Sequence, residues 1–137
     1  MDVTNLPLLI MNPAAQAEKN LDDALNNPDL EYKDHRHYIG FLGEHTKPNF
    51  SALEATHGLG KLLLAVKKWP NASWNHVYTI SGFSTRISPS DFYNLTCYAE
   101  YARLITDKPP KSYKGTKPGI RLTWLGHALL KQNGLEV

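Results

Sequence analysis

Cysteine is nearly absent from this chain: Cys97 is the single cysteine among 137 residues. An intramolecular disulfide or a cysteine zinc cluster is therefore excluded, and a reducing compartment fits this composition.

Long apolar runs are also missing. The segment Leu6–Met11 is interrupted by Pro7 and lacks the basic start and cleavage pattern of a secretory signal. We therefore expect a cytoplasmic protein that does not enter a membrane.

Recognisable catalytic and metal-binding patterns are lacking as well. The segment Gly58–Lys61 lacks the first glycine and the Ser or Thr of a phosphate-binding loop, and it lies within a helical pattern. The segment Asp34–His37, with Glu44 and His45 nearby, does not have the spacing of a metal-binding family. No base or electropositive setting is visible near Cys97. We therefore predict no catalytic residue, no metal and no cofactor, and a protein that is not an enzyme.

The formal net charge of +2 is small, but the charges are unevenly distributed. Residues 1–35 carry seven acidic side chains and two lysines, whereas the stretch from Arg103 to Lys131 carries seven cations and only Asp107 as an anion. Such asymmetry indicates a polyanionic partner for the basic end of the chain. The alternative is a solvated surface with no partner.

Capping residues and prolines predict where helices begin and end. A helix typically starts at Ser, Thr or Asn, often followed by Pro, and stops before Pro or at Gly or Asn. Ser51–Glu54 has the form of a capping box. On these patterns we expect helices from caps at Asn12, Ser51, Ser73, Ser88 and Thr123, ending near Leu25, Trp69, Ile80, Ile105 and Gln132.

A basic hairpin is expected between the last two helices. Ser112–Tyr113 and Ile120–Leu122 are the predicted strands, and Lys114–Gly119 is the tip between them. A short strand is also possible within residues 37–42. The sequence thus predicts an α+β, mostly helical fold with a small β-hairpin.

The order of helix, short helix, turn, capped helix, basic hairpin and helix resembles the winged helix-turn-helix superfamily. The most specific piece is Gly119–Leu130, which has an apolar strand, Leu-Thr, two residues, Gly and an apolar pair. The resemblance covers about residues 51–134. It implies a winged-helix domain over residues 51–137, and residues 1–50 as an N-terminal extension with one helix that packs on the domain or mediates dimerisation.

The resemblance further implies a protein that binds double-stranded DNA, as a transcriptional regulator or a DNA-organising factor, and as a homodimer. In this superfamily the third helix enters the major groove and the wing lies against the backbone or minor groove. Carried over by position, the residues expected to bind nucleic acid are Arg86, Ser88, Ser90, Tyr93 and Asn94 around the third helix, and Lys111, Lys114, Lys117 and Arg121 on the wing.

The presumed recognition helix departs from this pattern in its charge. It carries Asp91 and Glu100 and has no cation before Arg103, and carboxylates near phosphates are usually repulsive. The alternative function is therefore a protein-binding adaptor, or an inhibitor of a nucleic-acid machine, built on the same scaffold. Its partner would contact the acidic N-terminal surface formed by Asp22, Asp23, Asp29, Glu31 and Asp34.

Overall fold

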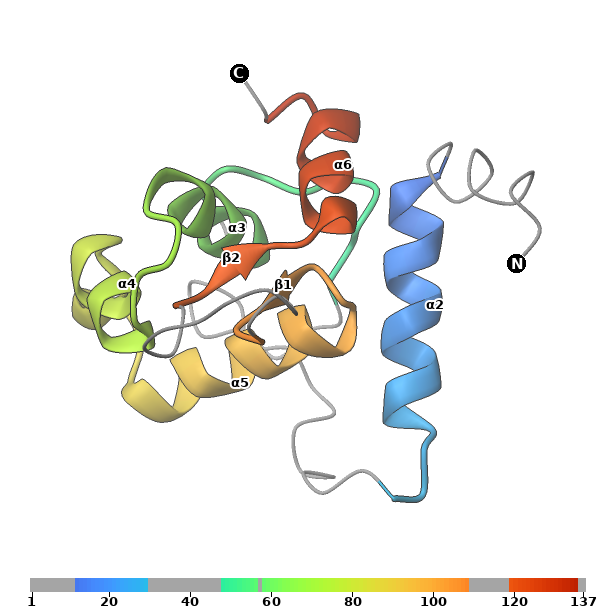
Figure 1. Cartoon of the computed structure of the whole chain (residues 1–137), viewed down its shortest axis with the longest axis horizontal. Coiled ribbons are helices and arrows are strands. Elements are labelled where there is room, and N and C mark those ends of the chain that lie inside the picture. The colour runs from blue at the N-terminus through green and yellow to red at the C-terminus, as the bar shows by residue number, and fades with distance from the viewer. Residues whose placement is uncertain (1–11, 30–47, 57, 109–118, 136–137) are drawn as a thin grey trace.

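The computed structural model describes residues 12–29, 48–56, 58–108 and 119–135 (Figure 1). These residues form an α+β fold that is mostly helical, with a two-stranded antiparallel sheet. None of the helices in these ranges has the length and apolar character needed to cross a bilayer. The elements are α2 (Pro13–Leu25), α3 (Gly58–Lys68), α4 (Trp74–Ile80), the 3-10 helix η2 (Phe83–Thr85), α5 (Pro89–Tyr101), β1 (Ile105–Thr106), β2 (Arg121–Leu122) and α6 (Trp124–Gln132).

Four helices begin at the caps predicted from the sequence. In each case the side-chain oxygen of the cap accepts a hydrogen bond from the backbone N–H three residues later, at 3.1–3.2 Å. Such a bond satisfies a donor that has no partner inside the helix. The predicted caps that are confirmed are Asn12 for α2, Ser73 for α4, Ser88 for α5 and Thr123 for α6.

The predicted helix start at Ser51 is wrong, because α3 begins only at Gly58. A contact with the far end of the chain ties this segment to α6. The amide of Asn133, at the end of α6, donates to the Phe50 carbonyl at 3.0 Å and accepts from the Leu53 N–H at 3.1 Å. These bonds anchor the segment before α3 to a part of the chain that is about 80 residues away. The segment Gly58–Lys61 is the first turn of α3, as its helical pattern indicates.

The end of α5 also differs from the prediction, because a strand and not a helix includes Ile105. The helix stops at Tyr101, four residues before Ile105, and Arg103 adopts a left-handed conformation with φ of 62°. The chain then continues as β1, which pairs with β2 in the register Ile105 with Leu122 and Thr106 with Arg121. Arg121 and Leu122 therefore pair with β1. The predicted strand Ser112–Tyr113 lies outside the described residues.

A third extended segment joins the two strands. Ala72, between α3 and α4, forms an antiparallel bridge with Ile120, which directly precedes β2. The Asn71 N–H donates to the Ile120 carbonyl at 2.8 Å, and the Ile120 N–H donates to the Ala72 carbonyl at 2.9 Å. A Cβ at Gly119 would lie 2.1 Å from the Asn71 carbonyl oxygen, so this close approach requires glycine. The bridge ties the start of α4 to the base of the hairpin.

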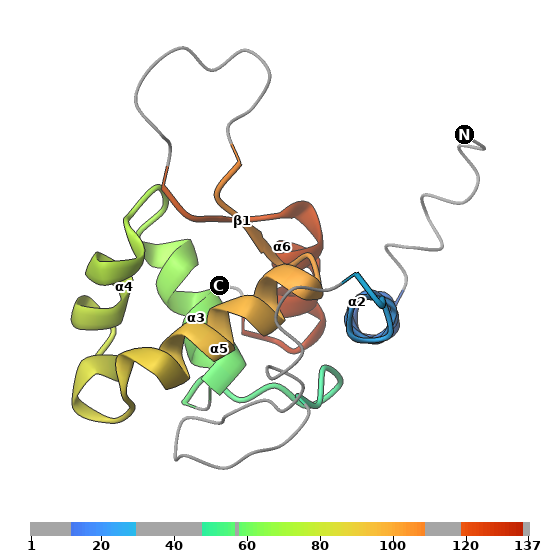
Figure 2. The ribbon, with the colours of Figure 1, turned by 90° about the horizontal axis from the view of Figure 1, so that it is seen from below.

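The described helices share one hydrophobic core. Its largest fully buried side chains include Tyr98, Phe83, Leu63 and Leu21. Helix α2 lies beside α5 and α6, at the opposite end of the molecule from α4 (Figures 1 and 2). The apolar face of α2 is thus part of the same core as α3, α5 and α6.

Candidate nucleic-acid interface

The turn between α4 and α5 is fixed by an aromatic cluster around Phe92. The Phe92 ring centroid lies 4.9 Å from that of Tyr78, 5.4 Å from that of Phe83 and 6.2 Å from that of Trp74. The Tyr78 hydroxyl also donates to the Ile87 carbonyl at 2.6 Å. Offset and edge contacts between aromatic rings stabilise such a cluster beyond its buried area. The two helices are therefore held at a defined angle.

The exposed surface of α5 that follows this turn is short. Ser88 and Ser90 are exposed, and Tyr93 is 45% exposed, in the first helical turns. The Ser88 hydroxyl is also the acceptor that caps the helix. Residues 95–99 are all buried. The predicted groove-facing surface is therefore limited to the N-terminal half of α5.

Arg86 and Asn94 lie on either side of this surface. Arg86 is exposed and directly precedes the cap of α5. Asn94 is only partly buried, but its Oδ1 atom is inaccessible and has no hydrogen-bond partner among the described residues. Of the five residues predicted around this helix, Arg86, Ser88, Ser90 and Tyr93 are exposed together near its start. Asn94 directs its oxygen inward at the edge of this group.

The base of the hairpin is closed by Arg121. This partly buried side chain donates from Nη2 to the carbonyl oxygen of Lys108, on the opposite arm. Its Nη1 atom is inaccessible and has no hydrogen-bond partner within the described residues. Arg121 therefore spans the hairpin neck, where it also carries a positive charge. The other predicted wing residues, Lys111, Lys114 and Lys117, lie outside the described residues.

Two carboxylates of α5, Asp91 and Glu100, lie at different distances from the exposed start of the helix, and further carboxylates lie on α2. Asp91 is partly buried in the first turn, where the positive end of the helix dipole favours an anion. Glu100 is exposed near the other end, ten residues after Ser90, which corresponds to about 15 Å along a helix axis. A more acidic surface is found on α2, where Glu18 and Asp23 are exposed and Lys19 pairs with Asp23 at 3.0 Å. The acidic surface and the start of α5 thus belong to opposite ends of the molecule (Figure 2).

Cys97 follows Tyr93 by one helical turn and is buried. Burial raises the pKa of the thiol, and the charge of Glu100 raises it further, while hydrogen bonds with Tyr93 and Tyr101 oppose the shift. The pKa of the neighbouring Tyr98 hydroxyl is also raised, mainly by burial. A thiol with a raised pKa carries little thiolate near neutral pH, so it is a poor nucleophile.

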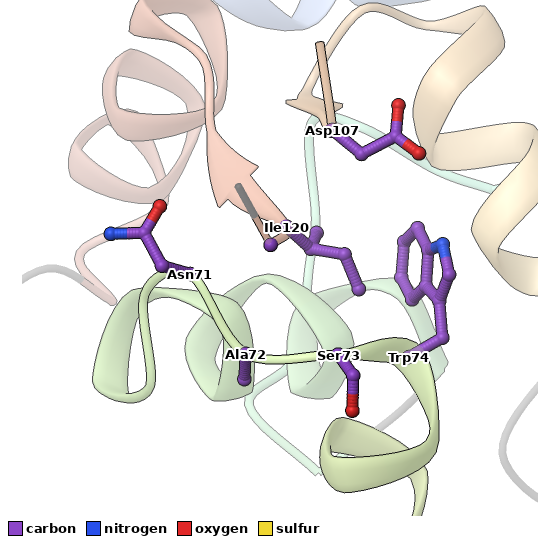
Figure 3. Close-up of a pocket in the computed structure, with 7 residues that line it drawn as sticks. Asn71, Ala72, Ser73, Trp74, Asp107 and Ile120 are labelled. Carbon is purple, nitrogen blue, oxygen red and sulfur yellow. The ribbon is translucent and has the colours of Figure 1, made fainter. Parts of the chain in front are cut away.

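The structure also brings together a group of residues that the sequence analysis did not single out. Trp74 and Asp107 line one pocket with Ile120, although they come from three separate segments (Figure 3). The Ala72–Ile120 bridge creates this proximity. No spacing or motif in the sequence could have indicated it, because the three residues are linked only through the fold.

The described residues contain no group of three or more His, Cys, Asp and Glu side chains able to hold a metal ion. The histidine-rich segment Asp34–His37, with Glu44 and His45, lies outside these ranges. Comparison with known proteins gives no match to a protein-family model, to a curated protein or to a solved structure.

Proposed function

We propose that this chain is a winged-helix protein that binds double-stranded DNA, as a transcriptional regulator or DNA-organising factor. The observation that carries the proposal is the Ala72–Ile120 bridge, which joins the start of α4 to the hairpin base beside the β1–β2 pair. A helix and a hairpin can contact one duplex together only if their relative positions are fixed. The aromatic cluster fixes α5 on α4, and the bridge fixes α4 on the hairpin neck.

The chemistry at the start of α5 supports contact with a phosphate backbone and base edges. Ser90 and Tyr93 are exposed residues that carry hydroxyl groups, and the exposed Arg86 adds a cation close to them in sequence. Serine, tyrosine and arginine are common donors to phosphate oxygens and base edges. Glu100 lies about 15 Å away along the helix, beyond the Debye length of roughly 8–10 Å at physiological ionic strength. Its repulsion therefore has little effect on a duplex at the first turns of α5.

Binding to a random duplex, measured by fluorescence anisotropy over a salt series, tests this proposal. Each phosphate contact steepens the dependence of log K on log salt by about one unit. We expect Arg86→Ala to make the slope shallower by about one unit, and the triple variant Lys111→Ala, Lys114→Ala, Lys117→Ala by about two to three units.

Lys131→Ala is the matched control, because it removes one exposed cation from the last turn of α6, away from the start of α5. It should leave the slope within experimental error of the wild-type value. Absence of binding at low salt, or an equal loss in all of these variants, would overturn the proposal.

A protein-binding adaptor or inhibitor is the second candidate, and the position of α2 favours it. Helix α2 lies at the end of the molecule opposite α4. Of the predicted acidic residues, Asp23 and Asp29 are exposed and Asp22 is partly buried, whereas Glu31 and Asp34 lie outside the described residues. A basic protein that binds α2 would therefore leave the start of α5 uncovered. The predicted homodimer stays a prediction, and sedimentation velocity of the purified chain tests it directly.

A further inference from the structure

A pocket of about 250 Å³ lies between the start of α4 and the neck of the hairpin (Figure 3). Its volume is below the roughly 300–1,000 Å³ that is typical of small-molecule sites. It suits a single side chain better than a whole metabolite. The described residues that line it are Asn71, Ala72, Ser73, Trp74, Asp107, Gly119 and Ile120.

The floor of the pocket is apolar and rigid. Ile120 is 1% exposed, and the bridge between Ala72 and Ile120 holds the floor by two backbone hydrogen bonds. Gly119 adds no side chain. A ligand group that lies on this floor must therefore present an apolar surface to it.

Two side chains give the pocket its chemical character. Figure 3 shows the indole of Trp74 and the carboxylate of Asp107 near one another on the same side, whereas the side chains of Asn71 and Ser73 point away. The Ser73 hydroxyl accepts from the His76 N–H as the cap of α4. Among the described lining residues, the carboxylate of Asp107 is the one charged group.

The indole of Trp74, which forms the aromatic wall of the pocket, is held in place by a neighbouring ring. Trp74 makes an edge contact with Phe92 at 6.2 Å between ring centroids, and Phe92 belongs to the buried cluster between α4 and α5. A preorganised aromatic wall loses little conformational entropy when a ligand binds. The pocket is therefore a preformed site and not a gap between mobile side chains.

We propose that this pocket binds an arginine side chain of a partner protein. A guanidinium group forms a charge-assisted hydrogen-bonded pair with a carboxylate and stacks on an indole ring. The methylenes of the same side chain suit the apolar floor at Ile120. Arginine is favoured over lysine because its planar group satisfies the carboxylate and the ring together.

The same features disfavour a phosphate group in this pocket. Asp107 would repel an anion, and the described lining residues include no cation, although Lys108 and Arg121 directly adjoin Asp107 and Ile120 in the sequence. The α4 dipole opposes a bound cation, but it amounts to at most about half an elementary charge at the helix start, against a full charge on Asp107. Within the described lining, the carboxylate therefore favours a cationic ligand. The proposal does not depend on DNA binding.

A titration followed by two-dimensional ¹H–¹⁵N NMR tests the proposal with the full chain. The probes are the capped tripeptide Gly-Arg-Gly and its citrulline analogue, which has the same shape without the charge. We expect the arginine peptide to shift the Trp74 indole N–H signal, assigned with Trp74→Phe, and the backbone signals of residues 72–74 and 119–120. The citrulline peptide should bind at least about tenfold more weakly, and the lysine peptide should also bind more weakly than arginine.

Asp107→Asn is the decisive variant, since it keeps the side-chain shape and removes the charge. We expect it to weaken binding of the arginine peptide by about tenfold or more. The matched controls are Asp91→Asn on α5 and Trp124→Phe on α6, neither of which lines the pocket, and both should bind as the wild type does. The same spectra report whether each variant is folded. Equal shifts with citrulline, unchanged binding by Asp107→Asn, or no shift at millimolar peptide would overturn the proposal.

Discussion

Among the residues that the structure describes, Cys97 and Tyr98 are the two groups whose protonation the fold alters most. Burial is the main cause of the raised pKa of both groups. Each therefore keeps its proton in the folded chain at a pH where the unfolded chain has begun to lose it. A raised folded-state pKa contributes stability that is present below the unfolded value and is lost as the pH rises.

We predict that the free energy of unfolding falls as the pH rises above about 9, the ordinary pKa of a cysteine thiol being 9.0. The Cys97→Ala variant should show a weaker decline, because it has no thiol to titrate. Urea unfolding followed by circular dichroism at several values between neutral and alkaline pH measures this. A decline as steep in Cys97→Ala as in the wild type would contradict the role of the thiol.

The side chain of Thr123, the cap of α6, makes two hydrogen bonds. The Thr123 hydroxyl accepts from the Gly126 N–H at 3.1 Å and donates to the Arg103 carbonyl at 2.6 Å. One side chain thus starts α6 and fixes the turn after α5. The sequence pattern indicated the cap, whereas the bond to Arg103 depends on how the turn folds back.

Helix α6 packs so closely on the backbone between α5 and β1 that a glycine is required. A Cβ at Gly126 would lie 2.3 Å from the carbonyl oxygen of Leu104, a backbone atom that accepts from the Thr123 N–H. This close approach explains the glycine that follows Leu122-Thr123 by three residues in the segment resembling winged-helix proteins. The glycine therefore serves packing between elements.

We predict that Gly126→Ala lowers the free energy of unfolding by about 1–3 kcal/mol, the usual cost of overpacking. Alanine is favoured over glycine by about 0.5–1 kcal/mol within a helix, so the clash with Leu104 must outweigh this gain. The exposed neighbour variant His127→Ala should stay within about 0.5 kcal/mol of the wild type. Chemical denaturation of both variants measures the difference, and a more stable Gly126→Ala would show that α6 moves freely on β1.

Helix α2 and the other described helices share one hydrophobic core. Leu21 is fully buried, and two hydrogen bonds join α2 to distant parts of the chain. The Asn20 side chain donates to the Ala102 carbonyl at 3.0 Å, and the Ala14 N–H donates to the Gln132 side chain at 2.9 Å. Residues 12–29 thus contribute to the same structural unit as the part from α3 to α6.

We predict that Leu21→Ala destabilises the protein by about 2–5 kcal/mol and that the variant unfolds in a single transition. The exposed Glu18→Ala on the same helix serves as the control and should change stability by less than about 0.5 kcal/mol. Far-ultraviolet circular dichroism and tryptophan fluorescence, followed in one denaturation series, provide two probes. Transitions at different denaturant concentrations would show that α2 folds separately.

Local chemistry in the sequence determined most helix boundaries. Asn12, Ser73, Ser88 and Thr123 cap helices because a short polar side chain satisfies a backbone donor three residues away, and this requires no other part of the chain. The same holds for Gly82, whose φ of 88° directly follows the C-cap of α4 at Ser81.

Only the tertiary structure decided the features that depend on distant partners. Asn133 ties the segment around Ser51 to the end of α6, Ile105 and Thr106 form a strand beside Arg121 and Leu122, and the Ala72–Ile120 bridge brings the segment of Trp74 to that of Asp107. Each results from backbone groups that find partners far away in the chain, where hydrogen bonding and burial outweigh local preference. A cap is set within four residues of sequence, whereas a pocket between three segments exists only after all three have packed.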